Sequence, residues 1–403
     1  MLEQPIARYL AGIRQSRPVP ARIILWDGTE IPLGDAPSVT IRLCDRAALA
    51  PLLNPSLDRL GDAFVEGHID IEGPMPDVIR VATQLADTRA GVSASGLLPR
   101  WARRHSRRSD KEAIAHHYDV SNEFYQLFLD ERMIYSCAYF RHESATLADA
   151  QLAKLDHICR KLRLSPGMRL LDIGCGWGAF AIHAARRYGV QVIGITLSAC
   201  QHELARERVR AAGLSAQVDI RLQDYRDVPE QNLDRIVSIG MFEHVGLRHL
   251  DEYFAAIHGR LRPGGVAMNH GITAADPDSR SVGRGAGEFI GRHVFPNGEL
   301  PHVSLAIQSI SRAGLELVDA ESLRRHYART LWHWSDRFEA NRQAALRIAG
   351  EERTRVWRAY LAGCAYGFEQ GWMNIYQLLV VRTPQHASTD EFSLPMTRDY
   401  MYR

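Results

Sequence analysis

The sequence has few of the features that mark a secreted, metal-stabilised or membrane-spanning chain. Its cysteines are few and scattered, with no C-x-x-C pair and no Cys/His metal spacing: Cys44, Cys137, Cys159, Cys175, Cys200 and Cys364. This usage indicates reduced thiols in the cytosol, and no metal site is expected. No apolar run reaches the roughly 20 residues that span a bilayer, and residues 1–20 contain no secretory h-region. Any membrane role is therefore expected at the surface of the bilayer.

An excess of charge of one sign is also missing. The chain has 49 Lys and Arg against 47 Asp and Glu, so global charge identifies no partner. The local exception is a predicted linker at 91–115, where basic side chains surround Trp101: Arg100, Arg103, Arg104, Arg107, Arg108 and Lys111. A solvated face and contact with anionic lipid headgroups, worth about 1 kcal/mol per basic side chain, both stay open. Nucleic acid is disfavoured because no aromatic ladder accompanies the charge.

The region before this linker, residues 1–90, is predicted to form a small α/β unit. Asp27-Gly28 is a strong hairpin signal between two β-prone runs, and Asp45 is a good helix N-cap. The elements expected are strands at 21–26, 29–33, 38–43 and 68–71, a helix at 46–53, and turns in the rest of 61–73. The region offers no catalytic set of residues, so a binding or interface role is expected.

The most informative stretch is Leu170–Gly178, where an apolar run meets Asp172 and then three glycines at alternate positions. An apolar strand with glycines just past its end suits a buried parallel strand whose turn lets a ligand approach bare backbone. The spacing is G-x-G-x-G rather than the G-x-G-x-x-G of dinucleotide sites. It resembles the first motif of class I S-adenosylmethionine methyltransferases. A glycine-rich turn in another α/β protein remains the alternative.

Strand and helix patterns alternate after this stretch, which predicts a doubly wound, mostly parallel sheet. Further strands are expected at 191–195, 218–222, 233–239, 266–269, 315–318 and 376–381, with helices at 147–162, 199–210 and 249–261. Five polar residues fall at or just past strand ends, where such sheets bind ligands: Asp172, Thr196, Asp224, Glu243 and His270. Residues 274–300 are predicted to be a lid or insertion. The aromatic helical insert at 327–363 is predicted to be core or the lining of an apolar pocket.

Seven motifs in order between residues 115 and 385 resemble one family. They are His117-Tyr118-Asp119-Val120, Tyr135–Tyr139, the glycine stretch, Gly194–Ser198, Leu222–Asp227, Met241–Gly246 and Phe295–Gly298. Together they look like the cyclopropane-fatty-acyl-phospholipid synthases and the related mycolic acid cyclopropane synthases. The resemblance implies an N-terminal lipid-facing domain at 1–90, a basic linker at 91–115 and a Rossmann-like catalytic domain at 116–403.

The resemblance also implies a cofactor site for S-adenosylmethionine. Tyr135 and Ser136 would reach the methionine end of the cofactor, beside Asp172, Gly174 and Gly176. Most class I enzymes hold the ribose with an acid after the second strand. This chain has Thr196 there, with Gln201 following, as the family does. Gln223 and Asp224 would lie near the adenine.

The implied reaction adds the cofactor's methyl carbon across a cis double bond of an unsaturated phospholipid acyl chain. A bound bicarbonate ion would then remove a proton from the resulting cation, so that a cyclopropane ring closes. By resemblance its cage is formed by Glu243, His270, Tyr327 and the backbone at Cys137 and Ile272. A cysteine near the family's site corresponds to Cys364. A small anion beside a cation would stabilise it as well as accept the proton.

Several further expectations combine the residues with the resemblance, and the homodimer alone rests only on the resemblance. The protein is expected to be a cytoplasmic homodimer that binds the inner membrane face peripherally, without nucleic acid partners. A methyl-, methylene- or hydroxy-branching enzyme is the nearest competing interpretation, because the same cation can be quenched differently. A non-catalytic lipid-binding protein on the same scaffold is a second competing interpretation, and a small-molecule methyltransferase is a third.

Overall fold

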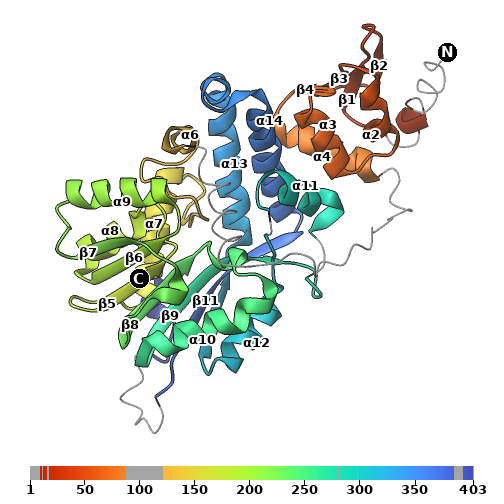
Figure 1. The fold of residues 1–403 in the computed structure, drawn as a ribbon. Coiled ribbons are helices and arrows are strands. Elements are labelled where there is room, and N and C mark those ends of the chain that lie inside the picture. The colour runs from red at the N-terminus through yellow and green to blue at the C-terminus, as the bar shows by residue number, and fades with distance from the viewer. Residues whose placement is uncertain are drawn as a thin grey trace.

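The computed structural model describes residues 10, 12–15, 18–87, 121–279, 282–296, 298–384 and 394–402 (Figure 1). The basic linker at 91–115 and the motif at 117–120 lie outside these ranges. The described residues form two sheets. A small sheet lies in the N-terminal unit, and a large sheet lies at the opposite end of the molecule, with two long helices between them (Figure 1).

The small sheet has the strand order β2-β1-β3-β4, with β1 and β3 parallel and the other pairs antiparallel. Its elements are β1 (Ala21–Ile24), β2 (Glu30–Pro32), β3 (Val39–Leu43), β4 (Ile69–Glu72), the short η1 (Arg46–Ala48) and helices α2 (Leu49–Leu53), α3 (Leu57–Val65) and α4 (Met75–Asp87). The four predicted strands are present. Asp45 caps η1 as predicted, since its side chain accepts a hydrogen bond from the Ala47 N–H.

The prediction of turns over the first part of 61–73 is wrong, because residues 61–65 belong to helix α3. Gly61 lies inside this helix and serves close packing. A Cβ atom there would lie 2.8 Å from the ring of Phe289, which belongs to the segment 274–300. Glycine is therefore required inside this helix by a distant contact that local sequence does not reveal. Helix α4 was not predicted either.

The large sheet has seven strands in the order β10-β11-β9-β8-β5-β6-β7. Strands β5 to β9 are mutually parallel, and β11 runs antiparallel to both of its neighbours. The strands are β5 (Arg169–Ile173), β6 (Gln191–Thr196), β7 (Val218–Leu222), β8 (Leu233–Ile239), β9 (Leu261–Ala274), β10 (Glu316–Ser322) and β11 (Met373–Val381). The predicted doubly wound α/β fold is thus confirmed.

Helices cover both faces of this sheet. Apolar side chains of α7, α8 and α9 pack on one face, and those of α10 and α12 pack on the other. The helices of this part are α6 (Asn122–Gln126), α7 (Leu147–Lys161), α8 (Ala179–Tyr188), α9 (Ala199–Ala211), α10 (Leu250–Arg260), α11 (Ala286–His293), α12 (Val303–Arg312) and α15 (Asp399–Tyr402), with short turns η3 (Tyr225–Asp227), η4 (Phe242–His244), η5 (Leu247–His249) and η6 (Gly283–Gly285). Strand order reverses between β5 and β8, which is where such sheets bind ligands.

The predicted helical insert is two helices rather than one. They are α13 (Arg324–Ala340) and α14 (Arg342–Glu369), separated at Asn341, and α14 is kinked at Gly350, whose φ is 78°. Their aromatic side chains pack with those of α6 in a buried aromatic cluster: Phe124, Tyr125, Phe128, Trp334, Phe338, Trp357 and Tyr360. The insert's aromatics are therefore core, and Tyr360 carries this core to the edge of the candidate site.

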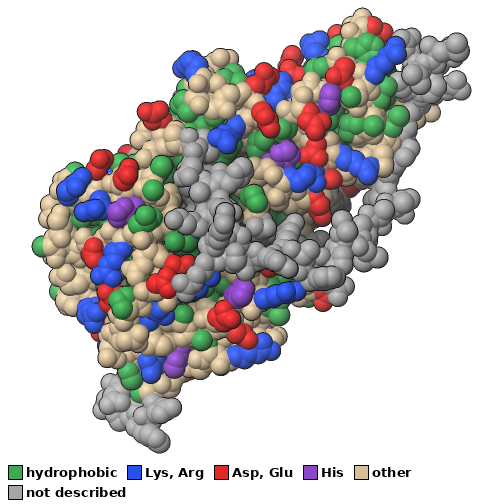
Figure 2. Space-filling view, in the orientation of Figure 1, with side chains coloured by type: hydrophobic (Ala, Val, Ile, Leu, Met, Phe, Trp, Pro, Cys, Tyr) green, Lys and Arg blue, Asp and Glu red, His purple; other side chains and the backbone are tan. Residues whose placement is uncertain are grey.

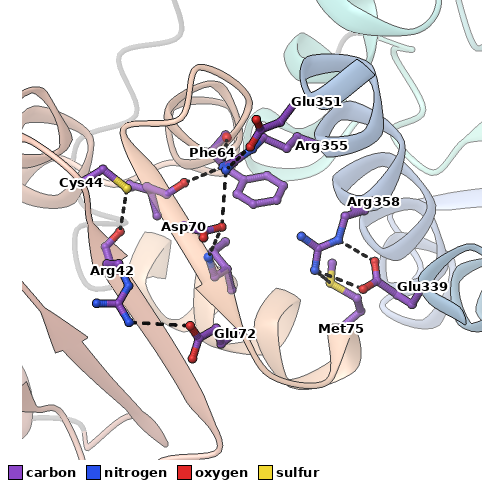
Figure 3. Close-up of polar contacts among 12 residues, drawn as sticks. Arg42, Cys44, Phe64, Asp70, Glu72, Met75, Glu339, Glu351, Arg355 and Arg358 are labelled. Atoms are coloured by element: carbon purple, nitrogen blue, oxygen red, sulfur yellow. Dashed lines mark hydrogen bonds and ion pairs between the residues drawn. The ribbon is translucent and has the colours of Figure 1, made fainter. Parts of the chain in front are cut away.

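The N-terminal unit contacts α14 through two arginines that lie one turn apart (Figure 3). Arg355 donates to the carbonyl oxygens of Phe64 and Ile69, at 2.9 and 3.1 Å. Arg358 is only 4% exposed and lies over the Phe64 ring, and its guanidinium donates to the Met75 sulfur at 3.9 Å. It also donates to both carboxylate oxygens of Glu339 on α13, at 2.6 and 3.1 Å. The same helix thus contacts the N-terminal unit with these residues and joins the aromatic cluster with Trp357 and Tyr360.

A second contact joins α3 to α11, in the segment predicted to be a lid or insertion. Arg292 donates to Asp62 at 2.6 Å, and a ring nitrogen of His293 lies 2.8 Å from the other oxygen of that carboxylate. On the face drawn in Figure 2, acidic and basic side chains are interspersed over both ends of the molecule. No helix in the described ranges is long and apolar enough to cross a membrane.

Candidate functional site

A cavity opens at the carboxyl edge of the large sheet, at the point where strand order reverses. It encloses about 980 Å³, counting its open mouth. Eight of the nine predicted cofactor residues line it: Tyr135, Ser136, Asp172, Gly174, Gly176, Thr196, Gln201 and Gln223. The convergence of strand ends β5 to β8 on one space places these residues together. Of the five polar residues predicted at strand ends, Asp172 and Thr196 line the cavity, and Asp224, Glu243 and His270 do not.

The glycine stretch forms the floor of this cavity. Gly174, Gly176 and Gly178 have φ values of 78°, 54° and 78°, in the left-handed region that side chains avoid. A Cβ on Gly174 would lie 3.1 Å from Met241, whereas one on Gly176 would meet no neighbour within 4 Å. Gly176 thus leaves open space over its backbone, which is the cradle that a ligand would fill.

The residues after β6 and β7 form a second wall. The Thr196 hydroxyl donates to the Gln201 side-chain oxygen at 2.9 Å, so the two buried side chains fix each other. Gln223 lines the cavity, but Asp224 does not. The Asp224 carboxylate accepts hydrogen bonds from the guanidinium of Arg226, at 2.9 and 2.6 Å. A role for Asp224 at the adenine stays a prediction.

Two buried ionisable groups, Asp172 and Lys154, line the end of the cavity predicted for the methionine part of the cofactor. Burial raises the pKa of Asp172 to about 7, although Lys154 opposes that shift, and Asp172 Oδ2 has no hydrogen-bond partner. Burial lowers the pKa of Lys154 to about 8, and its ammonium donates to the Ser136 hydroxyl at 2.7 Å. Lys154 lines the cavity and was not predicted from the sequence.

Glu243 lies in η4, just past β8, and is 8% exposed. Its Oε1 accepts a hydrogen bond from the Ile272 N–H at 2.7 Å, while its Oε2 is buried without a partner. Burial raises the pKa of Glu243 to about 7, against the opposing effect of that hydrogen bond. The Ile272 backbone therefore positions this carboxylate, and one carboxylate oxygen remains available to bind a proton or a donor.

His270 lies within β9 rather than just past its end, which corrects the predicted strand 266–269. The strand continues to Ala274 because β11 pairs with it as far as Met373. The Gln377 side-chain amide on β11 donates to His270 Nδ1 at 3.2 Å, which leaves the proton of the neutral ring on Nε2. Nε2 is buried without a partner, and burial lowers the pKa of His270 well below its usual value.

The other three predicted catalytic side chains lie in the core that surrounds the aromatic cluster, against which Ile272 also packs. Tyr327 packs on Phe368, with ring centroids 4.7 Å apart. The Cys137 thiol contacts the carbonyl oxygens of Ala138 and Leu323, and burial raises its pKa well above the usual range. Burial raises the pKa of Cys364 to about 12. Both cysteines are therefore thiols at neutral pH and poor nucleophiles.

The cavity and the core meet at a pair of tyrosines. The hydroxyl of Tyr135, which lines the cavity, lies 3.2 Å from that of Tyr360 on α14. The Tyr135 ring also lies 5.2 Å from that of Trp334. Helix α14 therefore contacts both regions: Arg355 bonds to the N-terminal unit, and Tyr360, about one turn later, lies against the cavity-lining Tyr135.

Lys154 and Gln377 are the residues that sequence reasoning missed. Gln151, Lys154, His157 and Lys161 recur on α7 at helical spacing, and all four are buried. That polar stripe is visible in the sequence, but polar residues along a helix usually mark its solvent side. No local signal marks Gln377, because its partner lies 107 residues away.

The fold and the cavity define a class of protein. A seven-stranded sheet with this order, a glycine turn after its first central strand and a buried acid at that strand's end form the class I S-adenosylmethionine-dependent methyltransferase architecture. A family model described as "Mycolic acid cyclopropane synthetase" matches residues 105–378, and a model described as a domain of unknown function matches residues 9–92. The chain belongs to the mycolic acid cyclopropane synthetase family, whose members are S-adenosylmethionine-dependent methyltransferases.

Some relatives match nearly the whole chain, and others match about two thirds of it. A probable fatty acid methyltransferase of Pseudomonas putida is 51% identical over 390 residues, covering 96% of this chain and 98% of that protein. The solved cyclopropane synthase MmaA2 of Mycobacterium tuberculosis is 36% identical, with a TM-score of 0.65, over 67% of this chain and 98% of that one. Mycolic acid cyclopropane synthase CmaA1, solved with SAH and CTAB, is 36% identical with a TM-score of 0.64, over the same shares of the two chains.

The residues of the cavity fit the cofactor of this family. The open backbone at Gly176 leaves room for a ligand, and Asp172 and Lys154 supply one buried charge of each sign. The methionine part of S-adenosylmethionine is a zwitterion with a carboxylate and an ammonium, so it matches this pair of charges. Elsewhere in the described ranges, no cluster of His, Cys, Asp or Glu could hold a metal ion.

Proposed function

We propose that the protein adds the methyl carbon of S-adenosylmethionine across a cis double bond of an unsaturated phospholipid acyl chain, forming a cyclopropane ring. The observation that supports this most is that two of the predicted catalytic side chains each bury a polar atom without a hydrogen-bond partner among the described residues, Glu243 Oε2 in η4 and His270 Nε2 on β9. Buried polar atoms are normally hydrogen-bonded, so an unpartnered atom on each of these two side chains supports a polar ligand that both would contact.

When bound, the cofactor supplies an electrophilic methyl carbon. An alkene is a neutral and weak nucleophile, so the chain's residues cannot activate it by removing a proton. They hold the double bond in line with the methyl group and exclude water, which would capture a cationic chain. Tyr135, Trp334 and Tyr360 are placed to do so, since they join the cavity to the buried aromatic cluster.

We further propose that Glu243 and His270 hold a bicarbonate ion that accepts the proton lost on ring closure. Neutral His270 donates from Nε2 to an oxygen of the anion, and Glu243 Oε2 accepts the hydrogen of its hydroxyl group. The raised pKa of Glu243 lets it share a proton with the anion, which removes the repulsion between like charges. Tyr327, Cys364 and the backbone at Cys137 complete the proposed surroundings.

A second candidate product is a methyl- or methylene-branched chain. The observation that favours it is the full-length relative from Pseudomonas putida, whose name specifies fatty acid methylation and no ring. Both products begin with the same transfer to the double bond. They differ in what happens to the cation: ring closure and a methylene product each release a proton, whereas a methyl product needs a hydride.

Mass spectrometry of lipids from cells that express the protein tests the proposal. Ring closure predicts a gain of one CH2 together with loss of the olefinic proton signals. The same gain with a double bond retained indicates the methylene product, and no gain on any unsaturated lipid contradicts methyl transfer to acyl chains.

We also propose that the chain divides at about residues 90 and 115, and that the linker contacts anionic lipid on the inner membrane face. Neutralising Arg103, Arg104, Arg107 and Arg108 together is expected to weaken binding to anionic vesicles at low salt. Unchanged binding would leave the linker as a solvated face.

A homodimer is proposed by resemblance, and sedimentation of the purified chain tests it.

A further inference from the structure

Among the described residues, the cavity wall contains one Lys or Arg side chain, and that side chain is buried. Lys154 is 1% exposed and projects from α7 to the side of the cavity that Ser136 and Asp172 also line. Its ammonium has three N–H donors, but among the described residues its one hydrogen bond goes to the Ser136 hydroxyl, at 2.7 Å. It forms no ion pair with any described carboxylate.

The carboxylates of Asp130 and Asp172 act on this ammonium electrostatically, but no described carboxylate is in contact with it. A buried ammonium without a contacting counter-ion is costly, so its environment indicates an anion that binds from outside. Lys161, two turns along the same helix, shows the alternative arrangement. It is fully buried, and its ammonium lies 3.1 Å from Asp319 and 2.6 Å from Glu321. The fold can therefore pair a buried lysine on α7 internally, and it does not do so at Lys154.

The position of Lys154 identifies the chemistry of that anion. Ser136 and Asp172 border the end of the cavity predicted for the methionine part of the cofactor, and Asp172 Oδ2 has no partner. An amino acid zwitterion presents one carboxylate and one ammonium a short distance apart. Lys154 with Ser136 suits the carboxylate, and Asp172 suits the ammonium.

We propose that Lys154 binds the carboxylate of the methionine part of S-adenosylmethionine, and that Ser136 shares this contact. This assignment rests on the cofactor of the proposed function but not on its product. Lys154 also lies near enough to His270 to lower that residue's pKa, so bicarbonate is the other anion to be distinguished.

Calorimetry with two ligands tests the assignment. S-adenosylhomocysteine carries the carboxylate, and 5′-methylthioadenosine lacks the whole amino acid part. Lys154→Met is expected to weaken binding of S-adenosylhomocysteine by about 10- to 100-fold, the range of one charge-assisted hydrogen bond, with 5′-methylthioadenosine unaffected. Arg187→Met removes an exposed positive charge from α8 and is expected to leave both affinities unchanged.

Decarboxylated S-adenosylhomocysteine provides a test on the unaltered chain, which does not depend on how the variant folds. It is expected to bind about as weakly as S-adenosylhomocysteine binds to Lys154→Met, and to lose nothing further in that variant. The assignment would be overturned if Lys154→Met lost equal affinity for S-adenosylhomocysteine and for 5′-methylthioadenosine. It would also be overturned if the unaltered chain bound decarboxylated S-adenosylhomocysteine with full affinity. Unchanged S-adenosylhomocysteine affinity with lost stimulation by bicarbonate would overturn it too, and would place bicarbonate at Lys154. Product analysis stays independent of all these outcomes.

Discussion

Helix α7 buries two lysines in opposite ways, one in its middle and one at its C-terminus. At its C-terminus, Lys161 forms ion pairs with Asp319 and Glu321 on β10. Arg398 also pairs with Asp319 at 2.6 Å, and a ring nitrogen of His157 lies 2.7 Å from the Glu321 carboxylate. Two turns earlier, Lys154 faces the cavity with a hydroxyl as its one described partner. The first arrangement is complete within the protein, whereas the second needs a ligand to complete it.

The carboxylates of the two regions differ in the same way, because the pKa of Glu321 in the network is lowered and the pKa of Glu243 in the candidate site is raised. Although burial alone would raise it, the contacts with His157 and Lys161 lower the pKa of Glu321 to about 2. Burial raises the pKa of Glu243 to about 7, because a single backbone N–H does not compensate for it. Paired buried charges therefore hold the fold together, and unpaired ones mark the site.

The largest expected effect on stability is at Lys161, in the network of paired buried charges. Lys161→Met removes the buried ammonium that pairs with both Asp319 and Glu321, leaving Arg398 beside the first and His157 beside the second, so the free energy of unfolding should fall by about 3 kcal/mol. Urea denaturation measures this loss. A change below about 1 kcal/mol would show that the network is as dispensable as an exposed ion pair.

The pH dependence of stability should have opposite signs in the two regions. The Glu243 pKa is raised, so the folded chain keeps a proton that the unfolded chain has lost between about pH 4.5 and 7. The free energy of unfolding should therefore fall by up to about 3 kcal/mol as pH rises through that window, relative to Glu243→Gln.

Glu321, whose pKa is lowered, contributes stability that is present above about pH 4.5 and is lost as pH falls toward 2. Urea midpoints across pH test both signs, and parallel curves for the unaltered chain and Glu243→Gln would contradict the first.

Glu243→Gln should lower the turnover rate by about 100-fold, because the amide cannot accept or share the proton of the bound anion. Its affinity for S-adenosylhomocysteine should stay unchanged, since Glu243 does not line the cofactor cavity. Glu252→Gln, on the exposed start of α10, is the matched control. A fully active Glu243→Gln enzyme would remove this residue from the mechanism.

Gln377→Met should have a smaller effect, through the His270 ring. Loss of the amide donor frees the ring to move its proton from Nε2 to Nδ1, so the bicarbonate concentration for half-maximal rate should rise about 10-fold. Gln370→Met changes an exposed glutamine at the end of α14 and serves as control. An unchanged bicarbonate dependence would contradict a positioning role for Gln377.

The smallest effect is expected at the contact between the N-terminal unit and α11. Asp62 bonds to Arg292 and His293 at the surface, where ion pairs contribute little. Asp62→Asn should lower the free energy of unfolding by less than about 1 kcal/mol, measured by urea denaturation. A larger loss would mean that the unit's attachment depends on this pair rather than on buried Arg358.

The sequence predicts what depends on neighbouring residues. The helix predicted at 147–162, the glycine turn and the strand ends at Asp172 and Thr196 all depend on local sequence, and all are found as expected. Lys154 was missed because the packing of α7 in the core of the large sheet, and not the local sequence, makes its helix face interior. Gln377 was missed because its role depends on register with His270, across the antiparallel pairing of β9 and β11.

The most direct measurement uses cofactor labelled with three deuterons on its methyl group and a defined cis-unsaturated phospholipid in bicarbonate buffer. Ring closure predicts a product that keeps two of the three deuterons, on a cyclopropane carbon, with the olefinic signals gone. Retention of all three deuterons on a branching methyl group, or of two on a carbon that is still olefinic, would contradict ring formation. No deuterium in the lipid would contradict transfer to an acyl chain.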